Sequence, residues 1–247
     1  MVLKSQIKYI QSLGDKKFRD QEGVFVAEGP KVLRELLDTS PLSAVQLFAL
    51  KDWISDTEAA QASWGNPPLA EVDPLVLGRM SNLKTPNRVL GIFRKPSPAD
   101  LVPAKQLSLV LDNIQDPGNL GTIIRIADWF GIQAIYCSLD CADAFGPKSV
   151  QSTMGSIGRV GLRYLEIYPL LQSCQDLPIY AAVLDGENIF DTRPSKEAMI
   201  IIGNESQGIR SEVLGLVNHH ITIPRKGMAE SLNAAVAAGI ILAQLSR

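Results

Sequence analysis

The chain has 247 residues, which is enough for one large domain or two modest ones. Hydrophobic residues make up 46% and charged residues 20%, a balance typical of a globular protein with a sizeable core. No apolar run reaches the roughly 20 residues that a membrane-spanning helix requires, and the N-terminal segment has no apolar stretch typical of a secretory signal. We therefore expect a cytoplasmic protein that does not enter a membrane.

The three cysteines point to neither a disulfide framework nor a metal site. Cys137, Cys141 and Cys174 are few and scattered, and Cys137 and Cys141 lack a second pair of ligands at zinc-site spacing. We expect reduced thiols and no bound metal.

The net charge of −2 conceals an asymmetry along the chain. Residues 1–98 carry 13 Lys and Arg against 11 Asp and Glu (+2), whereas residues 99–247 carry 11 against 15 (−4). Clustered cations, more than net charge, make a surface attractive to phosphates. These clusters predict RNA-binding residues at Lys16, Lys17, Arg19, Arg79, Lys84 and Arg88. Charge alone favours an ordinary solvated face.

The first third of the chain has the pattern of a small α/β module. Residues 28–38 predict a helix with a proline near its first turn, and short apolar runs lie at 24–27, 45–50 and 89–93. Three prolines within residues 95–105 disfavour continuation of helix or strand. We predict one domain over residues 1–98, a linker over 99–105 and a second domain over 106–247.

The second domain predicts an α/β fold with a mostly parallel sheet. Its short apolar runs do not alternate, as expected for strands covered on both faces; they lie at 107–111, 134–138, 179–184, 199–202 and 220–223. Helices are predicted between or after them at 120–130, 147–154, 169–174, 211–217 and 232–245. Ligands of such sheets bind at the carboxyl ends of the strands.

Three strand-end loops concentrate polar residues at that edge. In the first, Asn119 follows a Pro-Gly turn, where it could simply cap a helix, and Arg125 lies among isoleucines. A charge in such surroundings needs a carboxylate, carbonyl or phosphate, so a structural salt bridge is the alternative to a functional role. The second loop, residues 203–208, places Glu205 between two glycines, which let a ligand approach the backbone closely.

The third loop brings Ser231 and Asn233 to the start of a helix rich in small residues. Ser231 could be only the N-cap of that helix. No Gly-Lys-Ser/Thr follows a glycine loop, no G-x-G-x-x-G occurs, and no histidine lies in these loops. Phosphate-loop nucleotidases, dinucleotide-binding units and Ser-His-Asp hydrolases are therefore disfavoured.

In order and spacing, the three loops resemble the SpoU (TrmH-type) RNA 2′-O-ribose methyltransferases of the SPOUT superfamily. The motifs are P-G-N-x-G-x-x-x-R at 117–125, G-N-E-x-x-G at 203–208 and I-P-x-x-G-x-x-x-S-L-N at 223–233. The resemblance covers about residues 107–245. Arg225 and Lys226 depart from it, since the family often has Met and a small residue there. Residues 25–37 resemble the ribosomal L30e-like module often joined to that domain as its substrate-binding part.

The resemblance implies a C-terminal SPOUT domain with a deep trefoil knot, an exception to the usual unknotted topology. It also implies a homodimer with the active site at its interface and S-adenosyl-L-methionine as the cofactor. The catalytic residues carried over are Asn119, Arg125, Glu205, Ser231 and Asn233. Cofactor contacts would come mainly from the backbone at Leu184, Gly203, Ile223 and Leu232.

The expected activity is methylation of a ribose 2′-hydroxyl in structured RNA, with rRNA favoured and tRNA as the alternative substrate. Arg125 would position and activate the hydroxyl, and stabilisation of the developing alkoxide is preferred to base action because arginine stays protonated. The competing hypotheses are a non-catalytic knotted protein for RNA binding or ribosome assembly, and a SPOUT methyltransferase acting on a base. A hydrolase using Ser231 would lack a base.

Overall fold

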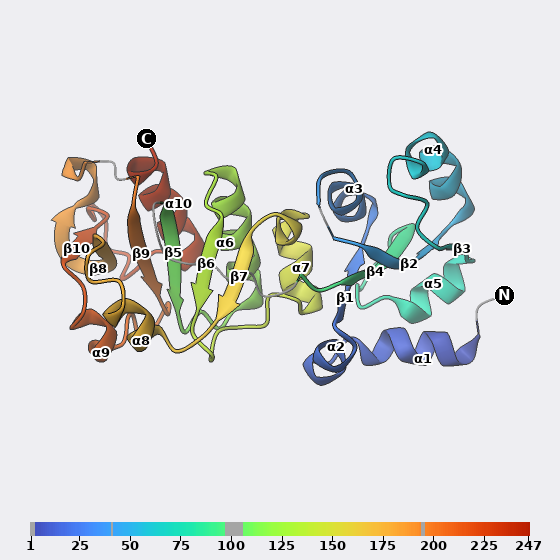
Figure 1. The fold of residues 1–247 in the computed structure, drawn as a ribbon, viewed down its shortest axis with the longest axis horizontal. Helices are drawn as coiled ribbons and strands as arrows, with labels where there is room; N and C mark the ends of the chain where they lie inside the picture. The colour runs from blue at the N-terminus through green and yellow to red at the C-terminus, as the bar shows by residue number, and fades with distance from the viewer. Residues whose placement is uncertain (1–2, 41, 97–105, 194–195) are drawn as a thin grey trace. The chain divides into compact units, whose positions relative to one another are not determined.

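The computed structural model describes residues 3–40, 42–96, 106–193 and 196–247 (Figure 1). Contacts divide the chain into two compact units. The N-terminal unit comprises Met1–Ser97 and Asp143–Arg159, and the C-terminal unit comprises Pro98–Ala142 and Val160–Arg247. Residues 143–159 thus group with the N-terminal unit, although they lie inside the predicted domain of residues 106–247. The predicted linker, 99–105, lies outside the described residues, and the predicted domain division stays a proposal.

The N-terminal unit is the α/β module that the apolar runs predicted, built on a mixed sheet. Its strands are β1 (Val24–Glu28), β2 (Ala44–Ala49), β3 (Leu69–Glu71) and β4 (Val89–Arg94), in the order β1-β4-β2-β3. β4 is antiparallel to β1 and β2, and β3 is parallel to β2. The helices are α1 (Lys4–Ser12), α2 (Lys16–Glu22), α3 (Pro30–Thr39), α4 (Lys51–Gln61), α5 (Pro74–Met80) and α7 (Pro147–Thr153), with a 3-10 turn η1 (Ser156–Gly158).

Arg19, predicted to bind RNA, instead lies inside the N-terminal unit. Only 3% of the residue is exposed, and its Nη2 lies 2.6 Å from Oδ2 of Asp143. Its Nη1 donates to the carbonyl oxygens of Leu13 and Gly14 at 2.7 and 2.6 Å. A buried guanidinium must find such partners, because an unpaired buried charge is expensive. The RNA-binding prediction for Arg19 is therefore wrong.

The C-terminal unit contains a six-stranded sheet in the order β10-β8-β9-β5-β6-β7, and every adjacent pair is parallel. The strands are β5 (Leu107–Asp112), β6 (Ala134–Cys137), β7 (Gly161–Tyr164), β8 (Ile179–Asn188), β9 (Ala198–Gly203) and β10 (His219–Thr222). The helices are α6 (Pro117–Trp129), α8 (Ile167–Gln172), α9 (Ser211–Leu214) and α10 (Ala234–Leu245), with a 3-10 turn η2 (Ile189–Asp191). The predicted parallel α/β fold is confirmed; the knot stays a prediction.

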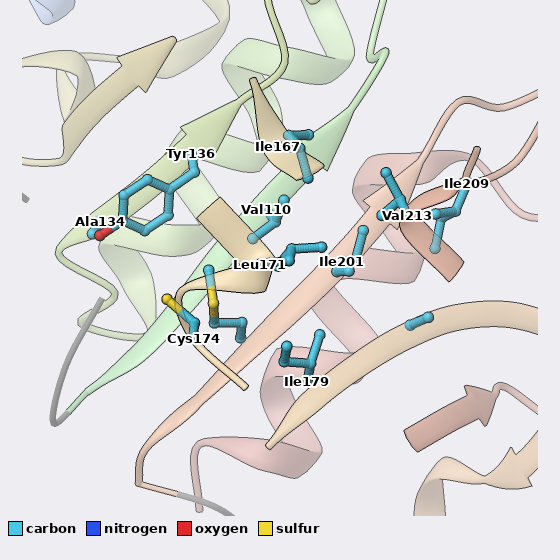
Figure 2. Close-up of a cluster of buried hydrophobic side chains, with 12 residues drawn as sticks. Val110, Ala134, Tyr136, Ile167, Leu171, Cys174, Ile179, Ile201, Ile209 and Val213 are labelled. Atoms are coloured by element: carbon cyan, nitrogen blue, oxygen red, sulfur yellow. The ribbon is translucent and has the colours of Figure 1, made fainter. Parts of the chain in front are cut away.

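Apolar side chains cover both faces of this sheet. Alternate residues of a strand point to opposite faces, and Val110, Met199 and Ile201 share one cluster with residues of α8 and α9 (Figure 2). α6 and α10 contact each other, and α10 also contacts β9. Burial on both sides explains the continuous apolar runs of β5 and β9. β7, at the sheet edge, is only partly buried, which is why its weakly apolar sequence did not predict a strand.

Candidate functional site

A cavity of about 630 Å³ opens beside the middle of β8 and the carboxyl ends of β9 and β10, which are three neighbouring strands. Its walls come from the end of β9 and the loop to residue 209, from β10 and the loop to residue 232, and from α10. The predicted cofactor-contact residues Leu184, Gly203, Ile223 and Leu232 all line it. These four residues come from three separate segments of the chain, and the structure places all of them at one cavity.

An irregularity in strand pairing opens the sheet at this point. His220 pairs with Ala181, but the next residue, Ile221, pairs with Glu187, so residues 182–186 of β8 have no partner on β10. Ala182, Val183 and Leu184 from this unpaired stretch line the cavity. Their backbone groups are therefore not used in pairing with β10, although Thr222 Oγ1 donates to the Leu184 carbonyl at 3.2 Å. No local pattern in the amino-acid sequence indicates this register shift.

The loop after β9 is closed by its own backbone hydrogen bonds, and a further hydrogen bond ties it to the residue that follows β5. Asn204 and Gly208 exchange two backbone hydrogen bonds of 3.0 and 2.9 Å, and Asn204 Nδ2 donates to the Asn113 carbonyl at 2.8 Å. A Cβ atom on Gly203 would lie 2.5 Å from the Gly208 carbonyl carbon, and Gly208 has a φ of 71°. Both positions therefore require glycine, for close approach and for a left-handed backbone.

An ion pair between Arg210 and Asp112 also anchors this loop. Arg210 donates to the fully buried carboxylate of Asp112 from its backbone nitrogen and from Nε, both at 2.8 Å. Its Nη2 lies 2.6 Å from Oδ1 of the same carboxylate. Neither residue was singled out from the sequence, because only the pairing of β5 with β9 brings them together.

A chain of side-chain hydrogen bonds joins the three sequence motifs. Asn119 Nδ2 donates to Glu205 Oε1 at 2.5 Å, and Asn233 Nδ2 donates to Asn119 Oδ1 at 2.8 Å. The Asn233 Oδ1 atom accepts from the backbone nitrogens of Ala235 and Val236 at 3.0 and 3.3 Å. The carboxylate of Glu205 is thereby connected to the first turn of α10 at the border of the cavity.

The helix caps differ from the ones considered from the sequence. Asp116, not Asn119, caps α6 by accepting from the Asn119 backbone nitrogen at 2.8 Å. Asn233, not Ser231, caps α10, which begins at Ala234. Ser231 is exposed and lines the cavity. The Asn119 amide, relieved of capping, is free to bridge Glu205 and Asn233.

Arg125 occupies a different environment from the one expected. It is exposed on α6, so the cost of a buried unpaired charge does not arise. It makes no hydrogen bond or ion pair with any residue that the structure describes, and it does not line the cavity. The salt-bridge alternative is therefore not supported. The structure does not bring Arg125 into the network of Asn119, Glu205 and Asn233.

The predicted RNA-binding cations of the N-terminal unit fall into two groups. Lys16, Lys17, Arg79 and Lys84 are exposed. Arg88 is half-buried and paired with two carboxylates: its Nε lies 2.9 Å from Asp52 and its Nη2 2.5 Å from Asp56. These carboxylates raise the pKa of Arg88. Their negative charges offset that of Arg88, so a direct role in phosphate binding is not supported.

Two features are absent from residues 3–40, 42–96, 106–193 and 196–247. No group of three or more His, Cys, Asp or Glu side chains there could hold a metal ion. No helix there is long and apolar enough to cross a membrane.

Family models match both parts of the chain. The SpoU rRNA Methylase family model matches residues 106–243, and the MRM3-like substrate binding domain model matches residues 4–91. The 23S rRNA (guanosine(2553)-2′-O)-methyltransferase RlmP of Bacillus subtilis is 29% identical over 97% of this chain and 95% of its own length. A 23S rRNA (uridine(2479)-2′-O)-methyltransferase of Streptomyces viridochromogenes is 25% identical over 95% and 86%.

A solved structure agrees with these relatives. The AdoMet-bound rRNA methyltransferase from Sinorhizobium meliloti superimposes with a TM-score of 0.85 and 30% identity, covering 99% of this chain and 95% of that one. The match extends over both units and includes all three loop motifs. The chain belongs to the SpoU rRNA methylase family.

Proposed function

We propose that this protein transfers a methyl group from S-adenosyl-L-methionine to a ribose 2′-hydroxyl of ribosomal RNA. The observation that carries the proposal is the hydrogen-bonded chain of Glu205, Asn119 and Asn233, which joins three family motifs at the border of one cavity. The two curated relatives named above methylate a guanosine and a uridine, respectively, at the 2′-oxygen. The target nucleotide therefore varies within the family, while the ribose chemistry is shared.

The cavity fits the cofactor in size and in chemistry. Its volume lies within the range of about 300–1,000 Å³ usual for small-molecule sites. Aliphatic side chains such as Leu184, Ile202 and Ile223 suit the adenine and methionine carbons, and the backbone polar groups of residues 182–184 and 203–208 suit its heteroatoms. When bound, the cofactor supplies a methyl group activated by a sulfonium. The residues named would hold it and exclude water.

Arg125 is proposed to act on the hydroxyl from a second chain. It is exposed and free of partners among the described residues, yet it does not line the cavity of its own chain. In a homodimer, Arg125 of the partner subunit would approach the cavity, orient the 2′-hydroxyl and stabilise negative charge on its oxygen. Trp129, one helical turn after Arg125, is 85% exposed. A large exposed apolar side chain beside Arg125 fits a surface that another protein covers.

The other catalytic assignments remain part of the proposal. Glu205 and Ser231 line the cavity and would contact the ribose, whereas Asn119 and Asn233 would hold Glu205 in place. The N-terminal unit would bind folded rRNA, and Lys16, Lys17, Arg79 and Lys84 would contact its phosphates. We propose the cytoplasm as the place of reaction, since bacterial 23S rRNA is the substrate named for the relatives.

The experiment is incubation of the purified protein with methyl-labelled S-adenosyl-L-methionine and an unmodified 23S rRNA transcript. Label should enter RNA and be recovered as a 2′-O-methylnucleoside after complete digestion. Label in a base would establish the alternative base methyltransferase. A non-catalytic knotted protein would bind RNA but transfer no label. Calorimetric titration with the cofactor tests this alternative directly, because such a protein would not bind S-adenosyl-L-methionine.

A further inference from the structure

The loop that joins β10 to α10, residues 223–233, carries two positive charges at the rim of the cofactor cavity. Arg225 and Lys226 both line this cavity, and both are exposed. They stand at the two positions where the chain departs from its family, which often has Met and a small residue there. A departure at the cavity itself favours a partner that differs among members of the family.

Neither cation is neutralised by a carboxylate among the described residues. Lys226 makes no hydrogen bond or ion pair with them, and Arg225 makes one hydrogen bond, from Nη1 to the Ala229 carbonyl oxygen at 3.3 Å. Arg88 and Arg210, by contrast, are each bound by an aspartate. Only one of the five N–H donors of Arg225 is used within its own loop. Both charges are therefore available to an anion.

The hydrogen bond to Ala229 folds the Arg225 side chain back along its own loop. Ala229 lies two residues before Ser231, and two residues of chain span at most about 7 Å. Ser231 also lines the cavity, and its proposed role is to contact the ribose. One end of the guanidinium therefore lies near the place where the reacting sugar would be held. In RNA the 3′-phosphate is attached to the carbon next to the one that carries the 2′-hydroxyl, so an anion accompanies that sugar.

Gly227, the residue after the two cations, leaves open space beside them. A Cβ atom at this position would meet no described atom within 4 Å, and Gly227 is not among the glycines with a left-handed backbone. Its own chain thus requires glycine neither for close packing nor for conformation, unlike the chain around Gly203 and Gly208. A glycine in such a position favours the approach of a ligand to the backbone.

The chemistry of the cofactor does not account for the two cations. S-adenosyl-L-methionine carries a sulfonium and an ammonium against one carboxylate, so its net charge is positive and cations at the rim do not favour its entry. The carboxylate is also present whichever RNA is methylated, yet relatives with Met at the position of Arg225 have no cation there. The RNA target does differ, since it is a guanosine for one relative and a uridine for another. An RNA phosphate is therefore the anion that fits.

We propose that Arg225 and Lys226 bind the phosphate that adjoins the methylated ribose and hold the target nucleotide over the cofactor cavity. Arg225 binds this phosphate through its remaining N–H donors, and Lys226 binds it as a point charge. The inference rests on the proposed function and deepens it, because it adds a substrate contact beside Ser231. It concerns only the nucleotide that reacts, whereas the N-terminal unit would bind the folded RNA around it.

The experiment compares methylation of an unmodified 23S rRNA transcript by the full-length protein and its variants. Arg225→Met and Lys226→Ala introduce residues of the kinds that the family often has, so the fold and the cofactor site should be retained. We expect the double variant to raise KM for the transcript about tenfold with a much smaller change in kcat. Each substitution should reduce the salt dependence of kcat/KM by about one in a double-logarithmic plot. Arg225→Lys, which keeps the charge, should retain most of the wild-type kcat/KM.

Lys196→Ala is the matched control. Lys196 is an exposed lysine of the same unit, lies before the first residue of β9 and does not line the cavity, which is at the other end of that strand. Its KM and salt dependence should equal those of the wild type. Calorimetric titration of the Arg225→Met/Lys226→Ala variant should give a cofactor affinity within about twofold of wild type, because the phosphate belongs to the RNA.

Two results would overturn this inference while methylation by the wild-type protein still supports the proposed function. One is an unchanged KM and salt dependence in the double variant. The other is weaker binding of S-adenosylhomocysteine together with unchanged binding of 5′-methylthioadenosine, which lacks the carboxylate, since the cations would then hold the cofactor. Absence of label in RNA with the wild-type protein would overturn the proposed function itself, and this inference with it.

Discussion

Asn233 donates a 2.8 Å hydrogen bond to Asn119, 114 residues earlier in the chain, and Asn119 in turn donates to Glu205. Only a side chain that donates and accepts at once can stand between these two partners. A primary amide does both, whereas a carboxylate only accepts. The identity of residue 119 is thus set by its two neighbours and not by the cap of α6.

Asn119→Asp should disrupt this series of hydrogen bonds with almost no change in side-chain volume. The new carboxylate would face Glu205 without a donor, and a hydrogen bond to a charged group contributes about 1.5–3 kcal/mol. We expect kcat/KM for methyl transfer to fall at least tenfold, measured with labelled cofactor and rRNA transcript. Thr122→Ala, an exposed position on the same helix, is the control. A wild-type rate for Asn119→Asp would remove the amide from any positioning role.

Gly203→Ala should weaken cofactor binding while leaving the fold intact. Its Cβ would lie 2.5 Å from Gly208 backbone, so the loop that lines the cavity must shift. Calorimetric titration with S-adenosyl-L-methionine should show at least a tenfold loss of affinity. Gly215→Ala should bind normally, because the nearest atom to its Cβ is 3.5 Å away. Equal affinities for the two variants would contradict the predicted role of the loop.

Arg125→Ala should separate chemistry from cofactor binding. Because Arg125 does not line the cavity, we expect cofactor affinity to stay within about twofold while transfer falls about a hundredfold. Mixing Arg125→Ala with Gly203→Ala under conditions of subunit exchange should restore activity, since a mixed dimer pairs one intact cavity with one intact Arg125. No recovery in verified mixed dimers would show that Arg125 acts within its own chain.

Arg19→Ala should reduce stability. The substitution leaves Asp143 without its partner in a site where the two side chains are 4% and 15% exposed. Breaking a buried pair costs about 3–5 kcal/mol, which should appear as a lower urea midpoint. Lys17→Ala, at an exposed neighbouring position, should leave the midpoint unchanged. An unchanged urea midpoint for Arg19→Ala would contradict the structural role of this ion pair.

Cys141 should make stability depend on pH. A hydrogen bond from the Cys137 thiol lowers the pKa of Cys141 to about 7, below the value of about 8.5 for an unfolded thiol. Between these values the unfolded chain binds the extra proton, so the free energy of unfolding rises with pH and the gain is lost as pH falls through 7. Denaturant titrations at several pH values should show this slope. It should be shallower in Cys141→Ser, and identical slopes would contradict the shifted pKa.

The amino-acid sequence alone determined the parallel α/β core, five of the six strands of its sheet and the three polar loops. Local pattern suffices for these, since a strand buried on both faces must be apolar throughout and loop residues follow strand ends directly. The resemblance to the SpoU methyltransferases, carried by the three loop motifs, named Leu184, Gly203, Ile223 and Leu232 as cofactor contacts, and all four line one cavity.

Tertiary structure alone decided how the polar groups pair. Arg19 was predicted to contact RNA, but it is buried and forms an ion pair with Asp143, 124 residues later in the chain. Asn119 and Ser231 were weighed as helix caps, and neighbouring Asp116 and Asn233 take those positions. Arg125 was expected to need a partner and proved exposed. A sequence records which residues can donate, accept or carry charge. Which of them meet depends on strand register and packing between segments far apart in the chain, and this long-range geometry has no local signature.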